Sequence, residues 1–252
     1  MLTDAHLHLQ DTLFSENIAS VIARANAAGV FRFLCASATL EDSETLLALC
    51  SHFKQITPFI GTHPWFAQKH NKKRLKKLLE KNPNANIGET GLDALKPNPF
   101  QEESFLDHIS LSVAFDRPFI VHCVKAAQDV IRCLKRFKNL PPFLCHALYG
   151  GKNEIDFLAD KGAYFSLNAR FFTRPDFEKK LSFYPMNRIL IETDSPFMRP
   201  ADDFCIDKTQ KHNLPENLSL TFKHLSQLYH LSEPDFGMIL KTNLAAFLKE
   251  TP

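Results

Sequence analysis

The chain of 252 residues is long enough for one large domain or two small ones, and this length is typical of a single α/β barrel. Its formal net charge of +2 excludes the strong basic field of a protein that coats nucleic acid non-specifically. That balance still allows a local cleft that handles a phosphodiester. No apolar run approaches the roughly 20 residues that cross a bilayer.

Six cysteines are scattered along the chain without any C-x-x-C spacing: Cys35, Cys50, Cys123, Cys133, Cys145 and Cys205. Several lie within apolar runs, which is typical of reduced and buried thiols. No basic segment with an apolar leader precedes the first motif, so we expect no signal peptide. Together these features predict a cytoplasmic protein with no membrane contact and no obligate protein partner.

Short apolar, β-branched or aromatic runs recur along the chain and predict eight strands. They are LTDAHLHL from Leu2, VFRFLCAS from Val30, ITPFIGTH from Ile56, NIGETGLD from Asn86, PFIVHC from Pro118, PFLCHA from Pro142, AYFSLN from Ala163 and RILIETD from Arg188.

Most intervals between these runs have a helical pattern. The first, over residues 15–29, begins with Ser15 as the expected N-cap and ends with Gly29. Similar patterns are LEDSETLLALCSHF, FQEESFLDHISLSVAF, AAQDVIRCLKRF and NEIDFLADKG, with a short helix at DFEKKLSF. Two further helices, in ENLSLTFKHLSQLYH and MILKTNLAAFLKE, are expected to close the last unit.

Strands that alternate with helices predict parallel βαβ units. Eight such units predict a closed (β/α)8 TIM barrel that forms a single domain over residues 1–252, with the site at the carboxyl ends of the strands. An open, doubly wound sheet is the alternative, but it would more often carry a glycine-rich phosphate turn after the first strand, and HLHLQDTLF contains none.

The segment KHNKKRLKKLLEKN, residues 69–82, is dense in lysine and arginine. Its leucines Leu75, Leu78 and Leu79 keep helical spacing, which favours a solvated helix on the outer wall of the barrel. A patch that contacts phosphate is the alternative interpretation.

Ionisable side chains recur where the predicted strands end. In TDAHLHL, His6 and His8 share one strand face, and alone they fit either hydrogen-bonded core histidines or a site. Other strands end in His63, Glu89, His122, His146 and Asp194. Because the carboxyl ends of barrel strands converge on one mouth, we expect all these side chains to meet there.

Imidazoles and carboxylates together suit Zn, Mn, Fe or Ni better than an all-oxygen site would. Six ligands are too many for one catalytic metal with an open position, so they predict two metals that share a bridging carboxylate. Such a pair, roughly 3.5–4 Å apart, activates water and stabilises both the attacking and the leaving oxygen in phosphoester hydrolysis. The expected cofactors are two divalent ions, with Zn, Mn and Mg as candidates.

The motifs DAHLHL, IGTHPW, NIGETGLD, FIVHC, LCHALYGG, RILIETDSPF, NLPENL and KTNLAAFL follow one another over essentially the full length. In this order they resemble the TatD family of metal-dependent deoxyribonucleases, within the wider group of amidohydrolase-like barrels. The specific signals are IGETGLD and ETDSP, whereas H-x-H is common. The resemblance implies a barrel hydrolase that acts on DNA.

By motif, the resemblance implies one metal held by His6, His8, Glu89 and Asp194. A second metal would be held by Glu89, His122 and His146, with Glu89 as the bridge. The implied catalytic residues are Asp194, Glu89 and His63. Asp194 would help to take a proton from the nucleophilic water, and His63 would orient the substrate phosphate or stabilise charge.

Three further residues lie in or after the last predicted strand, and their roles are less specific. Glu192 alternates to the strand face opposite Asp194, so we expect it to support the structure or a ligand. Asn213 and Pro215 fall where the family has an Asn-x-Pro element. Asn213 is therefore a candidate substrate contact, with a loop or packing role as the alternative.

The sequence departs from the family pattern near the predicted mouth. Val124 stands where an arginine is usual, Leu148 replaces an aromatic residue, and KHN replaces the usual Arg-Gly pair. Loss of the arginine removes a bidentate phosphate contact. The residues that could compensate are Lys125, Arg170 and Arg199.

Aromatic residues near the mouth offer surfaces for base stacking. Trp65, the only tryptophan, follows GTHP and could stack a base or pack under a loop. Phe171 and Phe172 after the seventh strand have the same two interpretations.

The leading hypothesis is a divalent-metal-dependent phosphodiesterase that hydrolyses DNA, trimming it from strand ends. A small-molecule hydrolase of the amidohydrolase or lactonase type is the first alternative. Many such barrels bridge their metals with a modified lysine on the fourth strand, where this chain has Glu89. A binding module without catalysis is the second alternative, and the complete set of ligands argues against it.

Overall fold

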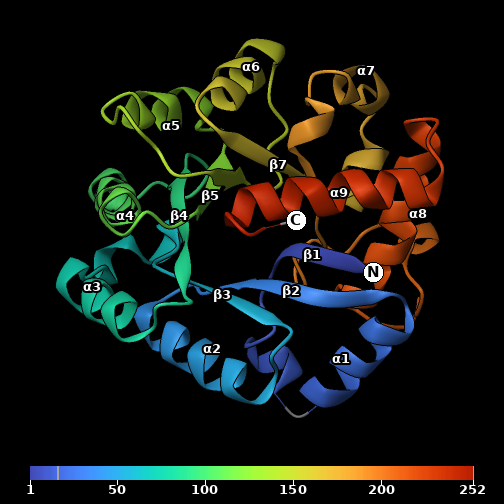
Figure 1. The fold of residues 1–252 in the computed structure, drawn as a ribbon, viewed down its shortest axis with the longest axis horizontal. Coiled ribbons are helices and arrows are strands. Elements are labelled where there is room, and N and C mark those ends of the chain that lie inside the picture. Colours follow the sequence, from blue (N-terminus) through green and yellow to red (C-terminus); the bar gives the residue numbers. More distant parts are fainter. Residues whose placement is uncertain (16, 252) are drawn as a thin grey trace.

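The computed structural model describes residues 1–15 and 17–251. Eight parallel strands follow one another in chain order around a barrel (Figure 1). They are β1 (Leu2–Leu7), β2 (Val30–Ala36), β3 (Ile56–Ile60), β4 (Asn86–Asp93), β5 (Phe119–Val124), β6 (Phe143–Cys145), β7 (Ala163–Leu167) and β8 (Ile189–Ile191).

Helices follow the strands on the outside of the barrel (Figure 1). They are α1 (Ile18–Ala27), α2 (Leu40–His52), α3 (Lys72–Lys81), α4 (Gln101–Phe115), α5 (Ala127–Leu134), α6 (Lys152–Asp160), α7 (Phe177–Leu181), α8 (Leu218–Leu228) and α9 (Glu233–Leu248). The predicted (β/α)8 barrel is confirmed, and the alternative of an open sheet is wrong.

The barrel closes between its first and last strands through backbone hydrogen bonds. Asp194 N donates to His6 O at 2.9 Å, and His8 N donates to Ser195 O at 2.7 Å. His6 lies within β1 and His8 directly after it, whereas Asp194 and Ser195 follow the end of β8. These two bonds hold the segment after β8 beside the H-x-H motif, which places two parts of the predicted site next to each other.

Several strands end before the residue that was predicted to close them. β1 stops before His8, β3 before His63, β6 before His146 and β8 before Asp194. At these points the backbone leaves the ladder to enter the loops of the mouth. Asp194 has the left-handed φ of 57°, which turns its side chain out of the strand alternation.

The beginning of the first helix was predicted wrongly. α1 begins at Ile18 with Asn17 as its N-cap residue. Ser15 instead ends the preceding helical turn, where its hydroxyl donates to Thr12 O at 2.8 Å. That local bond uses the side chain that would have capped the helix. The expected end is correct, since Gly29 has a φ of +90° after the last turn.

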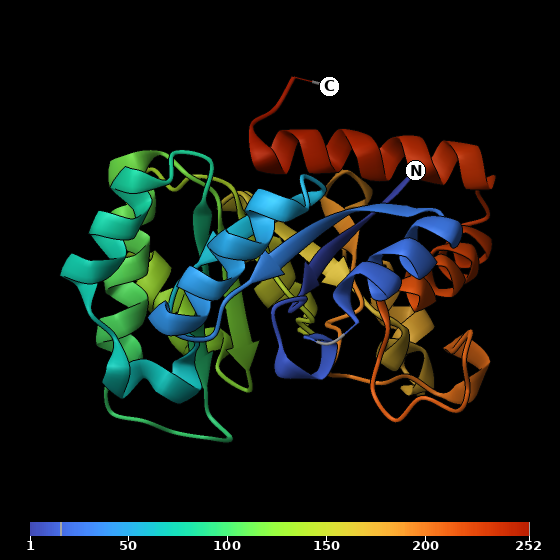
Figure 2. The ribbon, with the colours of Figure 1, turned by 90° about the horizontal axis from the view of Figure 1, so that it is seen from below.

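The helix α9 closes the barrel at the end where the strands begin (Figure 2). The ring of Phe247 enters the barrel interior and stacks on Phe59 with a centroid distance of 5.9 Å. Asn243 donates from its amide to Met186 O and Ile189 O at 2.9 and 2.8 Å. Because α9 fills this end, the opposite end is the one that faces the loops of the site.

The basic segment forms α3 on the outer wall, as its leucine spacing predicts (Figure 1). Leu75 and Leu79 are buried, whereas its lysines lie exposed. Asn71 caps the helix by accepting a hydrogen bond from Arg74 N at 3.0 Å. An amphipathic helix with its apolar stripe on the barrel explains the charge run without a phosphate ligand.

All six cysteines are free thiols, and every one except the half-buried Cys50 is buried. None of the described helices combines the length and the apolar character that a membrane span requires. A cytoplasmic location stays a prediction.

Candidate metal centre

The seven residues predicted at the strand ends meet at the carboxyl end of the barrel around the buried carboxylate of Glu89. Glu89 Oε2 lies 3.2 Å from His6 Nε2 and 3.6 Å from His8 Nε2. Glu89 Oε1 faces three other rings, at 2.7 Å from His122 Nδ1, 2.9 Å from His146 Nε2 and 3.4 Å from His63 Nε2. The two oxygens of one carboxylate therefore face two different groups of imidazoles.

Asp194 joins the group that contains the H-x-H motif. Its Oδ1 lies 3.5 Å from His6 Nε2 and 3.3 Å from His8 Nε2. Ligand atoms within 4.8 Å of one another form three sets: His6 with His8 and Glu89, His6 with His146 and Asp194, and His63 with Glu89 and His122. Six of the seven residues are the predicted metal ligands, and the third set also includes His63.

Asp4 supports this arrangement and was not singled out from the sequence. Its fully buried carboxylate accepts hydrogen bonds from Thr193 N at 2.9 Å and from the Thr193 hydroxyl. Burial raises the pKa of Asp4 well above its usual value, although these hydrogen bonds oppose the shift. Asp4 thereby fixes the residue before Asp194. The alternation of Asp4, His6 and His8 on one strand face was the signal that could have revealed it.

The hydrogen-bond partners of His8 define which of its nitrogens faces the site. His8 Nδ1 lies 2.7 Å from the carbonyl of Ala36, which can only accept. In the neutral ring the proton therefore resides on Nδ1, and the lone pair of Nε2 points toward Glu89 and Asp194. A histidine that donates to a backbone carbonyl through its outer nitrogen is the usual arrangement for a metal ligand.

His63 has the opposite arrangement. Its Nδ1 accepts a hydrogen bond from Trp65 N at 3.2 Å, so a neutral ring carries its proton on Nε2. That nitrogen lies 3.4 Å from Glu89 Oε1 and presents a donor to the site. Distance alone admits His63 as a ligand, but this tautomer favours a role in holding a substrate oxygen.

The buried nitrogens of the cluster test whether its residues fit a metal ion. The His6 ring is fully buried, and neither of its nitrogens makes a hydrogen bond to any described residue. His146 Nδ1 is likewise without a hydrogen bond among residues 1–15 and 17–251. A buried polar group without a partner is costly, and coordination by Nε2 would remove that cost for one of the two His6 nitrogens. The donor set therefore fits divalent metal ions.

Without a metal ion, the imidazoles of this cluster hold protons. Burial lowers the pKa of His8, but Asp194 and Glu89 outweigh it and raise that pKa to about 9. The pKa of His146 is raised well above its usual value because Glu89 and Glu192 outweigh burial in the same way. Burial raises the pKa of Glu89, but His146, His63 and His6 lower it well below the usual range. A divalent cation would replace the protons on these imidazoles.

Glu192 lies beside the cluster, so the prediction that strand alternation turns it to the face opposite Asp194 is wrong. Residues two apart in a strand share one face, and the left-handed φ of 57° at Asp194 interrupts the alternation. Glu192 is fully buried and accepts hydrogen bonds from the Ser166 hydroxyl and, at 2.9 Å, from Asn168 Nδ2. Its Oε1 lies 3.7 Å from His146 Nδ1. Glu192 therefore links β7 to the segment after β8, next to the predicted ligand His146.

The basic residues considered as replacements for an arginine at Val124 differ in availability. Lys125 directly follows β5 and is exposed, with a φ of 53°. Arg170 is also exposed, in the turn after β7. The guanidinium of Arg199 instead donates to Gln210 O at 2.8 Å and Asp202 Oδ1 at 2.7 Å, so it is committed to its own loop.

Asn213 is held entirely by protein partners. Its Nδ2 donates to Thr193 O at 2.7 Å, and its Oδ1 accepts from Asn217 Nδ2 and Leu214 N, both at 2.9 Å. The side chain is buried. These bonds fix the loop after β8 and give no support to a direct substrate contact.

The aromatic candidates also have protein partners. Trp65 is 42% exposed, but its Nε1 donates to Asp93 Oδ2 at 2.6 Å, and Lys96 Nζ lies 3.4 Å from its ring centroid. Phe171 is buried against Tyr149 at a centroid distance of 5.1 Å. Another ring, Phe172, packs against Phe204 and His224 at 4.8 and 4.4 Å. Packing therefore explains both phenylalanines.

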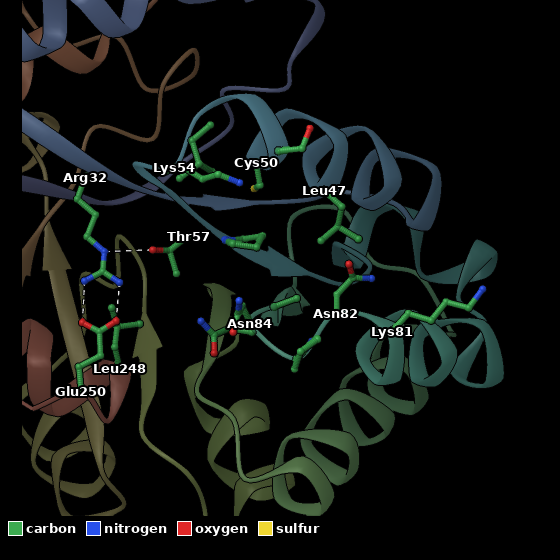
Figure 3. Close-up of a pocket in the computed structure, with 16 residues that line it drawn as sticks. Arg32, Leu47, Cys50, Lys54, Thr57, Lys81, Asn82, Asn84, Leu248 and Glu250 are labelled. Atoms are coloured by element: carbon green, nitrogen blue, oxygen red, sulfur yellow. Dashed lines mark hydrogen bonds and ion pairs between the residues drawn. The ribbon is translucent and has the colours of Figure 1, made fainter.

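One cavity lies at the other end of the barrel and is separate from the metal-ligating cluster (Figure 3). Its volume is about 610 Å³, and its walls include Ile56 and Asn86, which begin β3 and β4. Arg32 crosses it to form an ion pair with Glu250 at 2.6 Å. The cavity contains none of the predicted site residues.

An eight-stranded barrel with a buried cluster of imidazoles and carboxylates at its carboxyl end defines a metal-dependent barrel hydrolase. The family model described as TatD related DNase matches residues 3–249. The chain belongs to the TatD family and is a metal-dependent hydrolase that acts on ester bonds.

Individual relatives agree with this assignment. An uncharacterized metal-dependent hydrolase of Buchnera aphidicola is 28% identical, over 96% of this chain and 97% of the relative. A protein of Cronobacter turicensis named 3'-5' ssDNA/RNA exonuclease TatD is 27% identical, over 79% of this chain and 80% of its own. The structure of a TatD homologue from Escherichia coli superposes with a TM-score of 0.89 at 24% identity, over 100% of this chain and 98% of the other.

Proposed function

We propose that the chain is a divalent-metal-dependent phosphodiesterase that trims single-stranded DNA from its ends, with two metal ions bridged by Glu89. The observation that carries the proposal is the division of the Glu89 oxygens. One faces His6 and His8, and the other faces His122 and His146. A carboxylate with a separate ligand group at each oxygen is suited to link two cations.

Two metal ions at such a site would activate a water molecule and neutralise the charge that develops on a phosphodiester. The residues of the chain would then position the reactants. Asp194, whose Oδ1 lies 3.3 Å from His8 Nε2, would accept the proton of the attacking water. His63 presents an N–H toward the same region and would hold a phosphate oxygen.

The preference for strand ends follows from shape and charge. A duplex is stiff and broad, so a free end or a single strand reaches the bottom of a barrel mouth more easily. The net charge of +2 provides no long basic track that would hold an internal segment. The relative from Cronobacter turicensis is named as an exonuclease on single-stranded DNA and RNA, which supports nucleic acid as the substrate class.

The test compares a linear single-stranded oligonucleotide with a covalently closed circle of the same sequence, both with reconstituted enzyme. We expect metal-dependent release of mononucleotides from the linear strand, slower release from a duplex and no cleavage of the circle. Equal rates on the linear and circular strands would contradict trimming from ends. The rate on an RNA strand of the same sequence shows whether the enzyme prefers deoxyribose or ribose in its substrate.

A panel of lactones and amides tests the small-molecule alternative in the same preparation. Glu89 in place of a bridging lysine favours the phosphodiesterase. Turnover of a lactone or amide, with no cleavage of any nucleic acid, would contradict the proposed function.

A further inference from the structure

Asp93 ends β4 four residues after Glu89, and it lies outside the predicted ligand set. It is 3% exposed and lies between two side chains of the mouth. Its Oδ2 accepts a hydrogen bond from Trp65 Nε1 at 2.6 Å and lies 3.3 Å from His122 Nε2. Its Oδ1 accepts from Leu95 N at 2.9 Å and from Lys96 N at 3.2 Å.

Three of these four partners can only donate. The indole N–H of Trp65 and the backbone N–H groups of Leu95 and Lys96 have no lone pair to offer. They therefore require an acceptor at each oxygen of Asp93, which an ionised carboxylate supplies. Against such an acceptor, the Nε2 of His122 makes a favourable contact only when it carries a proton.

A proton on Nε2 leaves Nδ1 as the nitrogen of His122 that can coordinate a metal. Nδ1 is also the nitrogen that faces the cluster, at 2.7 Å from Glu89 Oε1 and 3.3 Å from His146 Nε2. The ring is therefore oriented at both ends. This pattern matches the general rule that a metal-ligating histidine donates its other N–H to a carboxylate.

We propose that Asp93 is a positioning residue that keeps the proton of His122 on Nε2 and so directs Nδ1 to the metal held by Glu89, His122 and His146. The inference rests on the metal centre of the proposed function. It does not depend on which substrate is hydrolysed.

Trp65 completes the arrangement by covering Asp93. Its indole N–H fixes the same carboxylate oxygen that His122 contacts, and Lys96 covers one face of the ring. An indole held at its N–H and covered by an ammonium group has less surface for stacking a base. Its role in this inference is to fix Asp93.

The first test observes the tautomer directly. In zinc-loaded protein with ¹⁵N-labelled histidine, we expect His122 to bind through Nδ1 and to carry its proton on Nε2. Coordination through Nε2, or no coordination of His122, would overturn the inference. This spectrum needs no substitution, so it decides the question even if a variant fails to fold.

The second test measures metal affinity in Asp93→Asn. The amide cannot accept from donors on both sides, because one of its two ends is itself a donor. We expect the ion at His122 to bind about 10- to 100-fold more weakly, as when other carboxylates behind ligating histidines are removed. The ion at His6 and His8 should keep its wild-type affinity. Unchanged affinity for both ions in a folded variant would overturn the inference.

Asp107→Asn is a matched control, because Asp107 Oδ2 also contacts a histidine, His70 Nε2 at 3.4 Å, away from the cluster. It should leave both metal affinities unchanged. The outcomes also separate the two proposals. If His122 binds zinc through Nδ1 and no nucleic acid is cleaved, the proposed function fails and the inference stands.

Discussion

Glu89 is the residue on which the candidate site depends most. It is buried, it contacts five imidazoles, and each of its oxygens faces a different part of the ligand set. The surrounding positive groups hold its pKa well below the usual range despite burial, so the carboxylate is ionised near neutral pH. Its charge and its two acceptor oxygens are both needed for a bridge.

Glu89→Gln should therefore lose most of both metal ions. The amide preserves the shape but replaces one ligand oxygen by an NH₂ group and removes the negative charge. Elemental analysis after dialysis measures the loss, with Glu102→Gln on the exposed face of α4 as the control. Wild-type metal content in the Glu89 variant would refute the bridge.

Gly91 explains why IGETGLD has a glycine two residues after the bridging acid. Its φ is +143°, and a Cβ atom there would lie 2.0 Å from His122 O. Only glycine lets β4 come this close to β5, and that approach sets the contact between Glu89 and His122.

Gly91→Ala should lower the free energy of unfolding by about 1–3 kcal/mol from overpacking, with additional backbone strain, and should weaken metal binding at His122. Gly29→Ala is the matched control, because Gly29 also has a positive φ but no atom within 4 Å of its Cβ position. The Gly29 variant therefore has the backbone strain of a positive φ but no steric clash. Denaturant unfolding and metal titration of both variants check this, and equal effects would refute the packing explanation.

His63→Ala should slow turnover while both metal ions stay bound. The reason is the tautomer that Trp65 N imposes, which gives His63 a donor in place of a ligand atom. Metal content and turnover are measured on the same preparation. Loss of one metal ion in this variant would instead make His63 a ligand, as its distance to Glu89 and His122 allows.

At the scale of elements, the strands place the ligands, and α9 closes the barrel at the end where the strands begin. Short apolar, β-branched or aromatic runs were enough to predict all eight strands, because parallel strands covered on both faces are apolar along most of their length. The role of α9 could not be predicted, since its apolar pattern shows only that one face is buried. The surface against which that face packs exists only once the barrel has closed, and there Phe247 stacks on Phe59.

Phe247→Ala should destabilise the fold by about 3–5 kcal/mol, the usual cost of removing a large buried ring. Met238→Ala on the same helix is the control, because Met238 is 68% exposed. Thermal and denaturant unfolding measure the difference. Because α9 lies at the end opposite the site, metal stoichiometry in the folded variant should equal that of the wild type, and its loss would contradict this separation.

At the scale of the whole molecule, the sequence reveals the site residues that the barrel topology brings together. It does not reveal those whose importance depends on hydrogen bonds between distant segments. The meeting of these side chains was predicted because each histidine or acid lies at or near the carboxyl end of a strand, and barrel strands end together. The prediction that the fourth strand ends at Glu89 is wrong, because β4 continues to Asp93. Asp4 and Asp93 were missed because their importance comes from partners distant in sequence, Thr193 for one and His122 for the other. Hydrogen-bond partners of this kind have no local sequence pattern.

The affinity for metal should rise with pH between 6.5 and 9. The pKa of His8 rises from 6.5 to about 9 in the protein alone, so a cation must displace its proton throughout this range. The increase is about tenfold per pH unit for each proton displaced. Titrations at pH 6.5 and 8.5 check this, and equal affinities would contradict it.

The stability of the metal-free protein should change in the opposite direction. A raised pKa in the folded state stabilises the fold fully below pH 6.5, and this contribution disappears as pH rises through about 9. Melting curves without metal should therefore shift downward across that window, whereas added metal should stabilise the protein more at its upper end.

The number of divalent ions bound per chain at saturation tests the bridged centre most directly. Equilibrium dialysis against Mn²⁺ measures it for the wild type and for His122→Ala. We predict two ions in the wild type and one in the variant, because His6, His8 and Asp194 remain on the other side of Glu89. A single ion in the saturated wild type, or two undiminished ions in the variant, would contradict the bridged two-metal centre.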